Sequence, residues 1–162
     1  MSYAEMILPE FDHEMVNTRK VLECIPDDKL DWRASPKMNT IGWNANHLAE
    51  IPGWVEGTLS QTEWDIAPEN GEAYQSPKLS TTKEIVAIFD QNVAAARAAL
   101  GAVKDEDMGV MWSLLQAGKP MMTMPRAAVI RGFVLNHTIH HRAHLCVYLR
   151  LNDIDVPAMY GG

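Results

Sequence analysis

The segment that follows Pro125 constrains the fold of this chain most strongly. Its apolar residues recur at every third or fourth position, which is the spacing of an amphipathic α-helix. Proline is tolerated in the first turn of a helix, and Asn152 and Pro157 supply stop signals at the other end. The pattern therefore predicts a helix from near Pro125 to about Leu149 or Leu151, with an apolar face that must be buried.

Two earlier helices are predicted by the same spacing. The first covers residues 11–25, and Pro9 marks its first turn or a kink in a slightly longer helix. The second begins after Thr40, a good N-cap residue, and its apolar stripe runs to residue 59. Because Pro52 lies in the middle of this stripe, we expect a kink or an early break there.

A third helix and two connections complete the chain. Thr81 and Glu84 have the spacing of a capping box, which predicts a helix from there through Val103. Residues 61–80 carry two prolines and a glycine without periodicity, so they indicate a long crossover that permits the next helix to run parallel to the last. Residues 110–124 hold two short apolar pieces, which favour a hairpin-like excursion over a continuous helix.

These segments together predict an all-α fold, a four-helix bundle with long crossover connections and a short hairpin-like excursion before the last helix. The chain has 162 residues, a length that suits one domain spanning residues 1–162.

Charge and cysteine content narrow the classes of partner. Fourteen basic and 21 acidic residues give a formal net charge of −7, so we expect no nucleic-acid partner. Cys24 and Cys146 are too few for a disulfide framework and lack zinc-knuckle spacing, which favours a reducing cytoplasm. We find no leader-like start and no apolar run of about 18 to 20 residues, and therefore expect neither export nor a membrane span.

Four of the six histidines lie between positions 137 and 144. Since each helical residue turns about 100°, all four fall on one broad face of the last helix. We expect His140 and His144 to lie next to a metal site, at an interface or on the surface, and not to be metal ligands. His137 and His141 share their stripe with apolar residues that must turn toward the interior, namely Ile130, Val134, Leu145 and Tyr148.

Buried histidines predict a metal site. Burying several imidazoles costs free energy unless their nitrogens find partners, and a divalent metal satisfies neighbouring rings. His137 and His141 are four residues apart and can share an ion. The third ligand should come from another helix, and His47 is the best candidate because apolar residues flank it, whereas His13 lies in a polar segment. The alternative is that these histidines are ordinary core or packing residues.

Residues near His47 are candidates for supporting roles. Glu50 follows it by three positions, so it can hydrogen-bond the ring or act as a proton acceptor in catalysis; an exposed helical glutamate is the alternative. Trp43 and Trp54 flank His47 and could wall a pocket, or they could be core residues.

Other residues of the last helix point away from the histidine stripe. Arg142 is expected to pair with an acid on a neighbouring helix or across a dimer, and Cys146 is expected to pack rather than react. The helix is apolar on this second side as well, which predicts burial against a partner subunit. The residues concerned are Leu135, Ile139, Cys146 and Leu149.

Three histidine ligands leave a coordination position open for water or substrate, as in catalytic zinc sites. A bound water whose pKa falls toward neutrality could attack an ester or amide, and a bound thiol could attack an electrophilic carbon. If His144 closed the shell instead, the metal would be structural and the protein a non-catalytic binding protein.

The stretches "PDDKLDWRASPKMNTIGWNANHLAEIPGW" at 26–54 and "LNHTIHHRAHLCVYLRLNDIDVPAMYGG" at 135–162 resemble the DinB/YfiT-like superfamily of metal-binding four-helix proteins. The resemblance implies that His47, His137 and His141 are the metal ligands, that the metal is zinc or nickel, and that the protein is a homodimer. One departure is that Ala143 and His144 stand where the family commonly has glycine and glutamine.

The same resemblance implies an activity. Relatives include transferases that use low-molecular-weight thiols such as bacillithiol or mycothiol. We therefore expect a metal-dependent enzyme acting on a small-molecule substrate, either a hydrolase or a thiol S-transferase.

Overall fold

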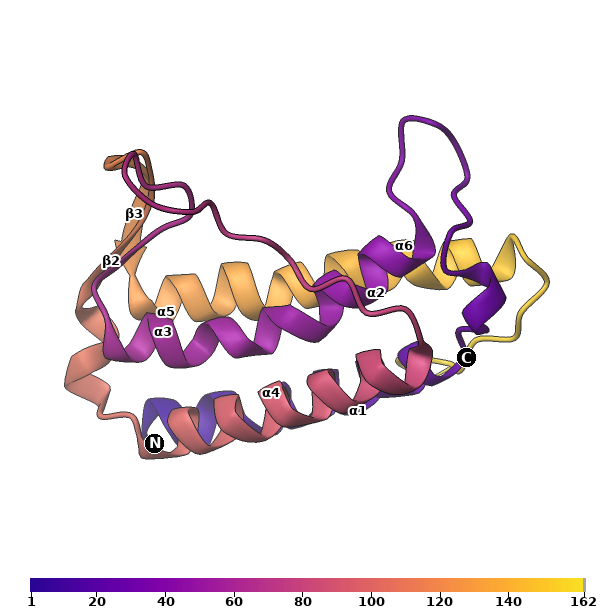
Figure 1. Ribbon diagram of the computed structural model, residues 1–162. Helices are drawn as coiled ribbons and strands as arrows, with labels where there is room; N and C mark the ends of the chain where they lie inside the picture. The colour runs from indigo at the N-terminus through magenta and orange to yellow at the C-terminus, as the bar shows by residue number, and fades with distance from the viewer. Residues whose placement is uncertain (162) are drawn as a thin grey trace.

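The protein is described here by a computed structural model, which covers residues 1–161. Figure 1 shows a helical bundle with a small sheet at one end. The helices are α1 (Tyr3–Glu23), α2 (Ile41–Glu50), α3 (Trp54–Ser60), α4 (Thr82–Ala102), α5 (Arg126–Val129) and α6 (His137–Arg150). Within the described residues, no helix is long and apolar enough to span a membrane.

Helix α1 begins earlier than the periodicity predicted. Ser2 and Glu5 form a capping box, in which Glu5 N donates to Ser2 Oγ at 3.2 Å and Ser2 N donates to Glu5 Oε2 at 2.7 Å. Pro9 therefore lies inside the helix, as the alternative of a slightly longer helix allowed. The start predicted at residue 11 was too late because the predicted stripe left out Ile7, which is 3% exposed.

The break predicted at Pro52 is confirmed. Thr40 caps α2 by accepting a hydrogen bond from Trp43 N at 3.0 Å. A short 3₁₀ segment, Ile51–Gly53, then separates α2 from α3. The two helices together form one bent arm of the bundle (Figure 1).

The start of α4 is also confirmed, since Thr81 and Glu84 make the predicted capping box. The crossover carries the chain from the end of α3 back along the bundle to the opposite end, where α4 starts (Figure 1). Helix α4 consequently runs parallel to the α2–α3 arm, as the length of the crossover permits.

The hairpin prediction is confirmed, and a continuous helix is excluded. Strands β2 (Met111–Gln116) and β3 (Lys119–Pro125) pair antiparallel through a turn at Ala117 and Gly118, whose φ angles are 50° and 71°. Positive φ at both positions is the geometry of the tight hairpin turn that matches strand twist. A third strand, β1 (Glu63–Asp65), pairs parallel with β2 and was not predicted, because three residues are too few to show a period.

The final helical segment is not one regular α-helix. It starts at Arg126 and ends at Arg150, close to the predicted limits, but residues Ile130–Asn136 (η4) form a π-helical stretch. The periodicity of the sequence predicted a uniform helix, and this part of the prediction was wrong. The wider turn ends at His137, the first histidine of the cluster.

The interior is one apolar cluster. Helix α1, the α2–α3 arm, helix α4 and the final helical segment all contribute to it. The predicted stripe on the last segment is buried: Ile130, Val134, Leu145 and Tyr148 are at most 3% exposed. On the second apolar side, Leu135, Cys146 and Leu149 are buried as well, within the same chain. That side therefore gives no argument for a partner subunit, and the homodimer stays a prediction from family resemblance.

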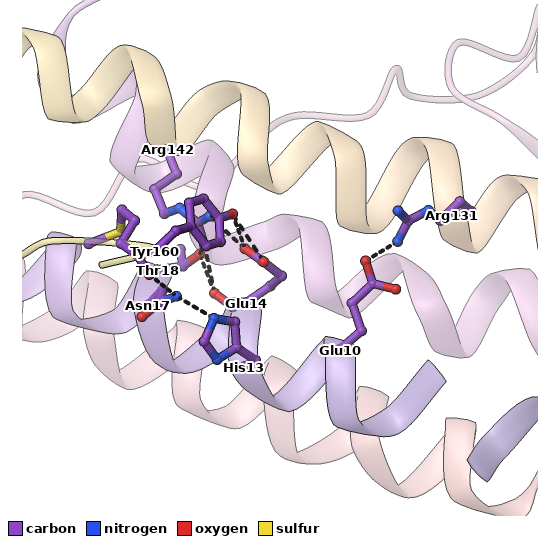
Figure 2. A network of polar contacts seen from close by, with 9 residues as sticks. Glu10, His13, Glu14, Asn17, Thr18, Arg131, Arg142 and Tyr160 are labelled. Carbon is purple, nitrogen blue, oxygen red and sulfur yellow. Dashed lines mark hydrogen bonds and ion pairs between the residues drawn. The ribbon is translucent and has the colours of Figure 1, made fainter. Parts of the chain in front are cut away.

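Arg142 anchors α6 to α1 through a buried polar network (Figure 2). Its Nη2 atom lies 2.5 Å from Glu14 Oε2 and 2.6 Å from the Tyr160 hydroxyl, which itself donates to Glu14. Nη1 donates to the Glu14 carbonyl at 3.0 Å and to Thr18 Oγ1 at 3.2 Å. Of the two predicted partners for Arg142, the structure shows the acid on a neighbouring helix. The network sets the rotation of α6 and holds the C-terminal tail on α1.

We predict that Arg142→Met lowers the free energy of unfolding by about 3–5 kcal/mol, because it leaves the Glu14 carboxylate buried without a cation. Urea denaturation followed by circular dichroism measures the loss. The matched control is Arg131→Met, which breaks a pair with Glu10 whose side chains are 50% and 39% exposed, and should cost about 0–1 kcal/mol. Equal losses in the two variants would show that the buried pair is not the anchor.

Candidate metal centre

His47, His137 and His141 meet between α2 and α6. Nε2 of His137 lies 2.9 Å from Nε2 of His141 and 3.3 Å from Nε2 of His47. One nitrogen of each ring lies within 4.8 Å of the other two, so the group could hold a metal ion. The fold thus brings together the three histidines that the sequence singled out, two from one turn of α6 and one from α2.

Hydrogen bonds to the outer nitrogens fix two of these rings. Nδ1 of His141 lies 3.1 Å from Oδ1 of Asn44, and this amide is oriented because its Nδ2 donates to the Thr40 carbonyl at 2.9 Å. Nδ1 of His47 contacts the Glu50 carboxylate. Both Nδ1 atoms face acceptors and must donate, so in the neutral rings Nε2 carries the lone pair.

The pKa values support the neutral form. Burial first, and then the neighbouring His47 ring, lower the pKa of His137. Burial followed by the His47 and His137 rings lowers the pKa of His141 to about 3. Neutral imidazole is the form that binds a metal ion.

The three rings fit a divalent transition metal. Tetrahedral coordination with metal–nitrogen bonds of about 2.0–2.1 Å places ligand nitrogens about 3.3 Å apart, close to the separations found here. Without a cation, lone pairs on adjacent Nε2 atoms would face one another in a partly buried site. The donor set and its spacing are therefore those of a cation site.

The remaining histidines and Cys146 lie apart from this group. His140 and His144 are exposed and stack at 4.3 Å between ring centroids; their nitrogens group with His141 but not with His47 or His137. Cys146 is buried in the apolar cluster, in keeping with a packing role. Among the described residues, none of His140, His144 and Cys146 joins His47, His137 and His141 as a fourth possible ligand.

A cavity of about 320 Å³ opens beside the cluster. His47 and His137 border it, whereas His141 does not. The other walls are mainly apolar and come from α3, the crossover, the hairpin and η4. They include Trp54, Trp64, Trp112, Leu114, Met122 and Phe133. The histidine cluster is thus reachable from a sheltered apolar space.

The π-helical stretch shapes one wall of this cavity. Val129, Phe133 and His137, each four residues apart, all line it. In a regular α-helix, residues four apart drift around the axis by about 40° per step. The wider turn of a π-helix counteracts this drift, and such segments are frequent at functional sites.

Glu50 is buried, with 4% of its surface exposed, so the exposed-glutamate alternative was wrong. Its Oε2 accepts a hydrogen bond from the Tyr74 hydroxyl at 2.5 Å, and its Oε1 accepts from Ser76 Oγ at 3.0 Å while contacting His47. Burial and this carboxylate raise the pKa of Tyr74, so its hydroxyl stays protonated and acts as a donor.

Hydrogen bonds hold the crossover at both ends, so that it covers one side of the cavity. Near α4, the Asn46 amide accepts from Leu79 N at 2.8 Å and donates to Leu79 O at 3.1 Å. Near the sheet, β1 pairs with β2, and Tyr74 N donates to Ile66 O at 2.8 Å. These contacts hold Tyr74 and Ser76 over Glu50.

Sequence reasoning found the three histidines and Glu50 but missed several residues around them. Asn44 lies three residues before His47, so helical spacing could have found it. Tyr74 and Ser76 lie in an aperiodic segment and carry no signal. Of the two flanking tryptophans, Trp54 lines the cavity, whereas Trp43 is 40% exposed and stacks on His47 at 4.8 Å between ring centroids.

Comparisons with known proteins agree with this fold. The chain is similar to a DinB-like protein from Bacillus cereus ATCC 10987, with 25% identity, a TM-score of 0.75, and coverage of 96% of this chain and 97% of that one. It is also similar to the DinB-like protein YjoA of Bacillus subtilis, with 13% identity, a TM-score of 0.70, and coverage of 97% and 99%.

Among curated proteins, no significant match is found. The family model of the DinB superfamily matches residues 10–145, which include all three histidines of the trio. This chain belongs to the DinB superfamily.

Proposed function

We propose that this protein is a metal-dependent enzyme in which His47, His137 and His141 hold a divalent transition metal, zinc or nickel, beside a small-molecule site. The observation that carries the proposal is the convergence of three Nε2 atoms, two of which belong to rings that border a cavity. A metal bound there supplies Lewis acidity, which activates a water or thiol nucleophile and polarises a substrate carbonyl.

The chain's own residues prepare this chemistry by positioning. Asn44 and Glu50 hold the His141 and His47 rings in the tautomer that leaves Nε2 free. Tyr74 and Ser76 keep Glu50 in place, and the apolar walls limit water around the reacting groups. We propose that Glu50 acts as a positioning residue, because its oxygens already accept three hydrogen bonds.

The alternative is a structural metal whose shell is closed by His144. Against it, the His144 nitrogens group with His140 and His141, away from the cavity side of the cluster. Because His47 and His137 border the cavity and His144 does not, a metal held by the trio would have an open position toward the cavity, which supports an enzyme over a closed structural site.

Metal analysis tests the ligand set. Protein purified without chelator is expected to contain about one transition metal ion per chain, as a single three-histidine site requires. His137→Ala should lose the metal, whereas the matched His144→Ala variant should retain it. If His137→Ala keeps wild-type metal content, measured by inductively coupled plasma mass spectrometry, the proposed ligand set is wrong.

The positioning role of Glu50 predicts a graded effect. Glu50→Gln keeps the side-chain shape but removes the charge that holds the His47 ring, so metal affinity should fall about 10- to 100-fold. Competition with a chromogenic chelator measures this affinity. Glu56→Gln on the exposed face of α3 is the control and should match the wild type. Unchanged affinity in Glu50→Gln would reject the role.

The identity of the nucleophile can be decided by assay. Aryl esters and electrophilic substrates are incubated with metal-loaded protein, with and without a low-molecular-weight thiol, while His47→Ala serves as the inactive control. Turnover that needs metal alone would establish a hydrolase, and turnover that needs both metal and thiol would establish an S-transferase. No turnover of any substrate with fully loaded protein would favour the non-catalytic binding protein.

A further inference from the structure

We propose that the cavity beside the histidine cluster selects an uncharged, apolar molecule of about two-ring size that carries one oxygen acceptor. This inference rests on the proposed function and deepens it, since it names the class of substrate. Three features of the cavity support it: its size and walls, its charge, and its unpaired donors.

The volume and the walls of the cavity indicate the size and the apolar character of the ligand. A cavity of about 150 Å³ accommodates benzene, so a volume near 320 Å³ suits about two fused rings. Trp54, Trp64, Trp112 and Phe133 supply flat aromatic surfaces on several sides. Burial of an aromatic ligand against such walls is favourable in free energy, whereas burial of a sugar or peptide would leave polar groups without partners.

The charge of the walls disfavours anionic groups away from the metal ligands. Among the described residues that line the cavity there is no lysine or arginine, and Glu50 adds a carboxylate. A phosphate or polycarboxylate held by these walls would lose its hydration without gaining a cationic side chain, so a metal ion on the histidines would be its one cationic partner. A polar low-molecular-weight thiol is likewise mismatched to these walls, which leaves the cavity to the electrophilic substrate.

Unpaired donors indicate the oxygen. Trp54 and Trp112 both line the cavity, and the Nε1–H of each is buried and finds no hydrogen-bond partner within residues 1–161. The hydroxyls in the wall are already engaged: Thr58 donates to the Trp54 carbonyl at 2.8 Å, and Tyr74 and Ser76 donate to Glu50. Since buried unpaired donors are costly, a carbonyl or ester oxygen on the ligand fits beside one of these two N–H groups.

The probe is 2-acetylnaphthalene, an uncharged ketone, compared with 2-isopropenylnaphthalene, which has nearly the same shape without the oxygen. Binding is measured by quenching of tryptophan fluorescence in the metal-loaded protein. The ketone should bind about 2- to 13-fold more tightly, which corresponds to a neutral hydrogen bond. After chelation, which removes the metal ion as a partner for the phosphate, the anionic 2-naphthyl phosphate should bind more weakly than either.

Amino-acid substitutions test the assignment. The double variant Trp54→Phe, Trp112→Phe keeps aromatic walls but removes both N–H groups, so the preference for the ketone should disappear while the hydrocarbon binds as before. Trp32→Phe, whose ring packs against Tyr148 and does not line the cavity, is the matched control and should keep the preference. Leu114→Trp fills the cavity and should abolish binding of both probes.

The inference is overturned if naphthyl phosphate binds the chelated protein as tightly as the ketone does, if Leu114→Trp leaves binding unchanged, or if a protein folded by circular dichroism binds neither naphthalene. An unchanged ketone preference in the double variant overturns the assigned donors. Repeating the titration after chelation distinguishes failure of this inference from failure of the proposed function. If the protein binds the probes but holds no metal and turns over no substrate, the proposed enzyme is rejected while the ligand class assigned to the cavity stands.

Discussion

Three imidazole nitrogens that face one another are compatible with a divalent cation between them, and the surrounding structure is arranged around that geometry. Asn44 and Glu50 hold the outer nitrogens of two rings, so the inner nitrogens are left with lone pairs. Burial keeps two of the rings neutral. The chain thus contributes an ordered donor set in advance, and ordering side chains before binding reduces the entropic cost of metal capture.

Helix α6 can present its histidines accurately because its other side is anchored. Arg142 follows His141 directly and points about 100° away around the helix, into the network with Glu14 and Tyr160. One residue therefore fixes the rotation of the helix while its neighbour faces the site. Arg142 can be buried in the bundle, with only 2% of its surface exposed, because α1 and the C-terminal tail supply partners for its charge and its N–H donors.

Local signals were sufficient for most helices and for the histidine trio. The box formed by Thr81 and Glu84, the break at Pro52 and the apolar stripe around His137 each depend on residues close together in the chain. The early start of α1 was missed because its capping box lies outside the stripe. The second apolar side of the last helix was read as a subunit contact, although Leu135 and Leu149 are buried inside their own bundle.

The sequence by itself determined the helical arms, the hairpin and the identity of the three inward-facing histidines, because helical periodicity and capping are properties of neighbouring residues. Only the tertiary structure decided the π-helical turn before His137, the pairing of β1 with β2, and the placement of Tyr74 and Ser76 over Glu50. These features join segments that are distant in the chain or depend on packing between arms. Such packing energies leave no periodic mark in the sequence, yet they form the cavity beside the histidine cluster.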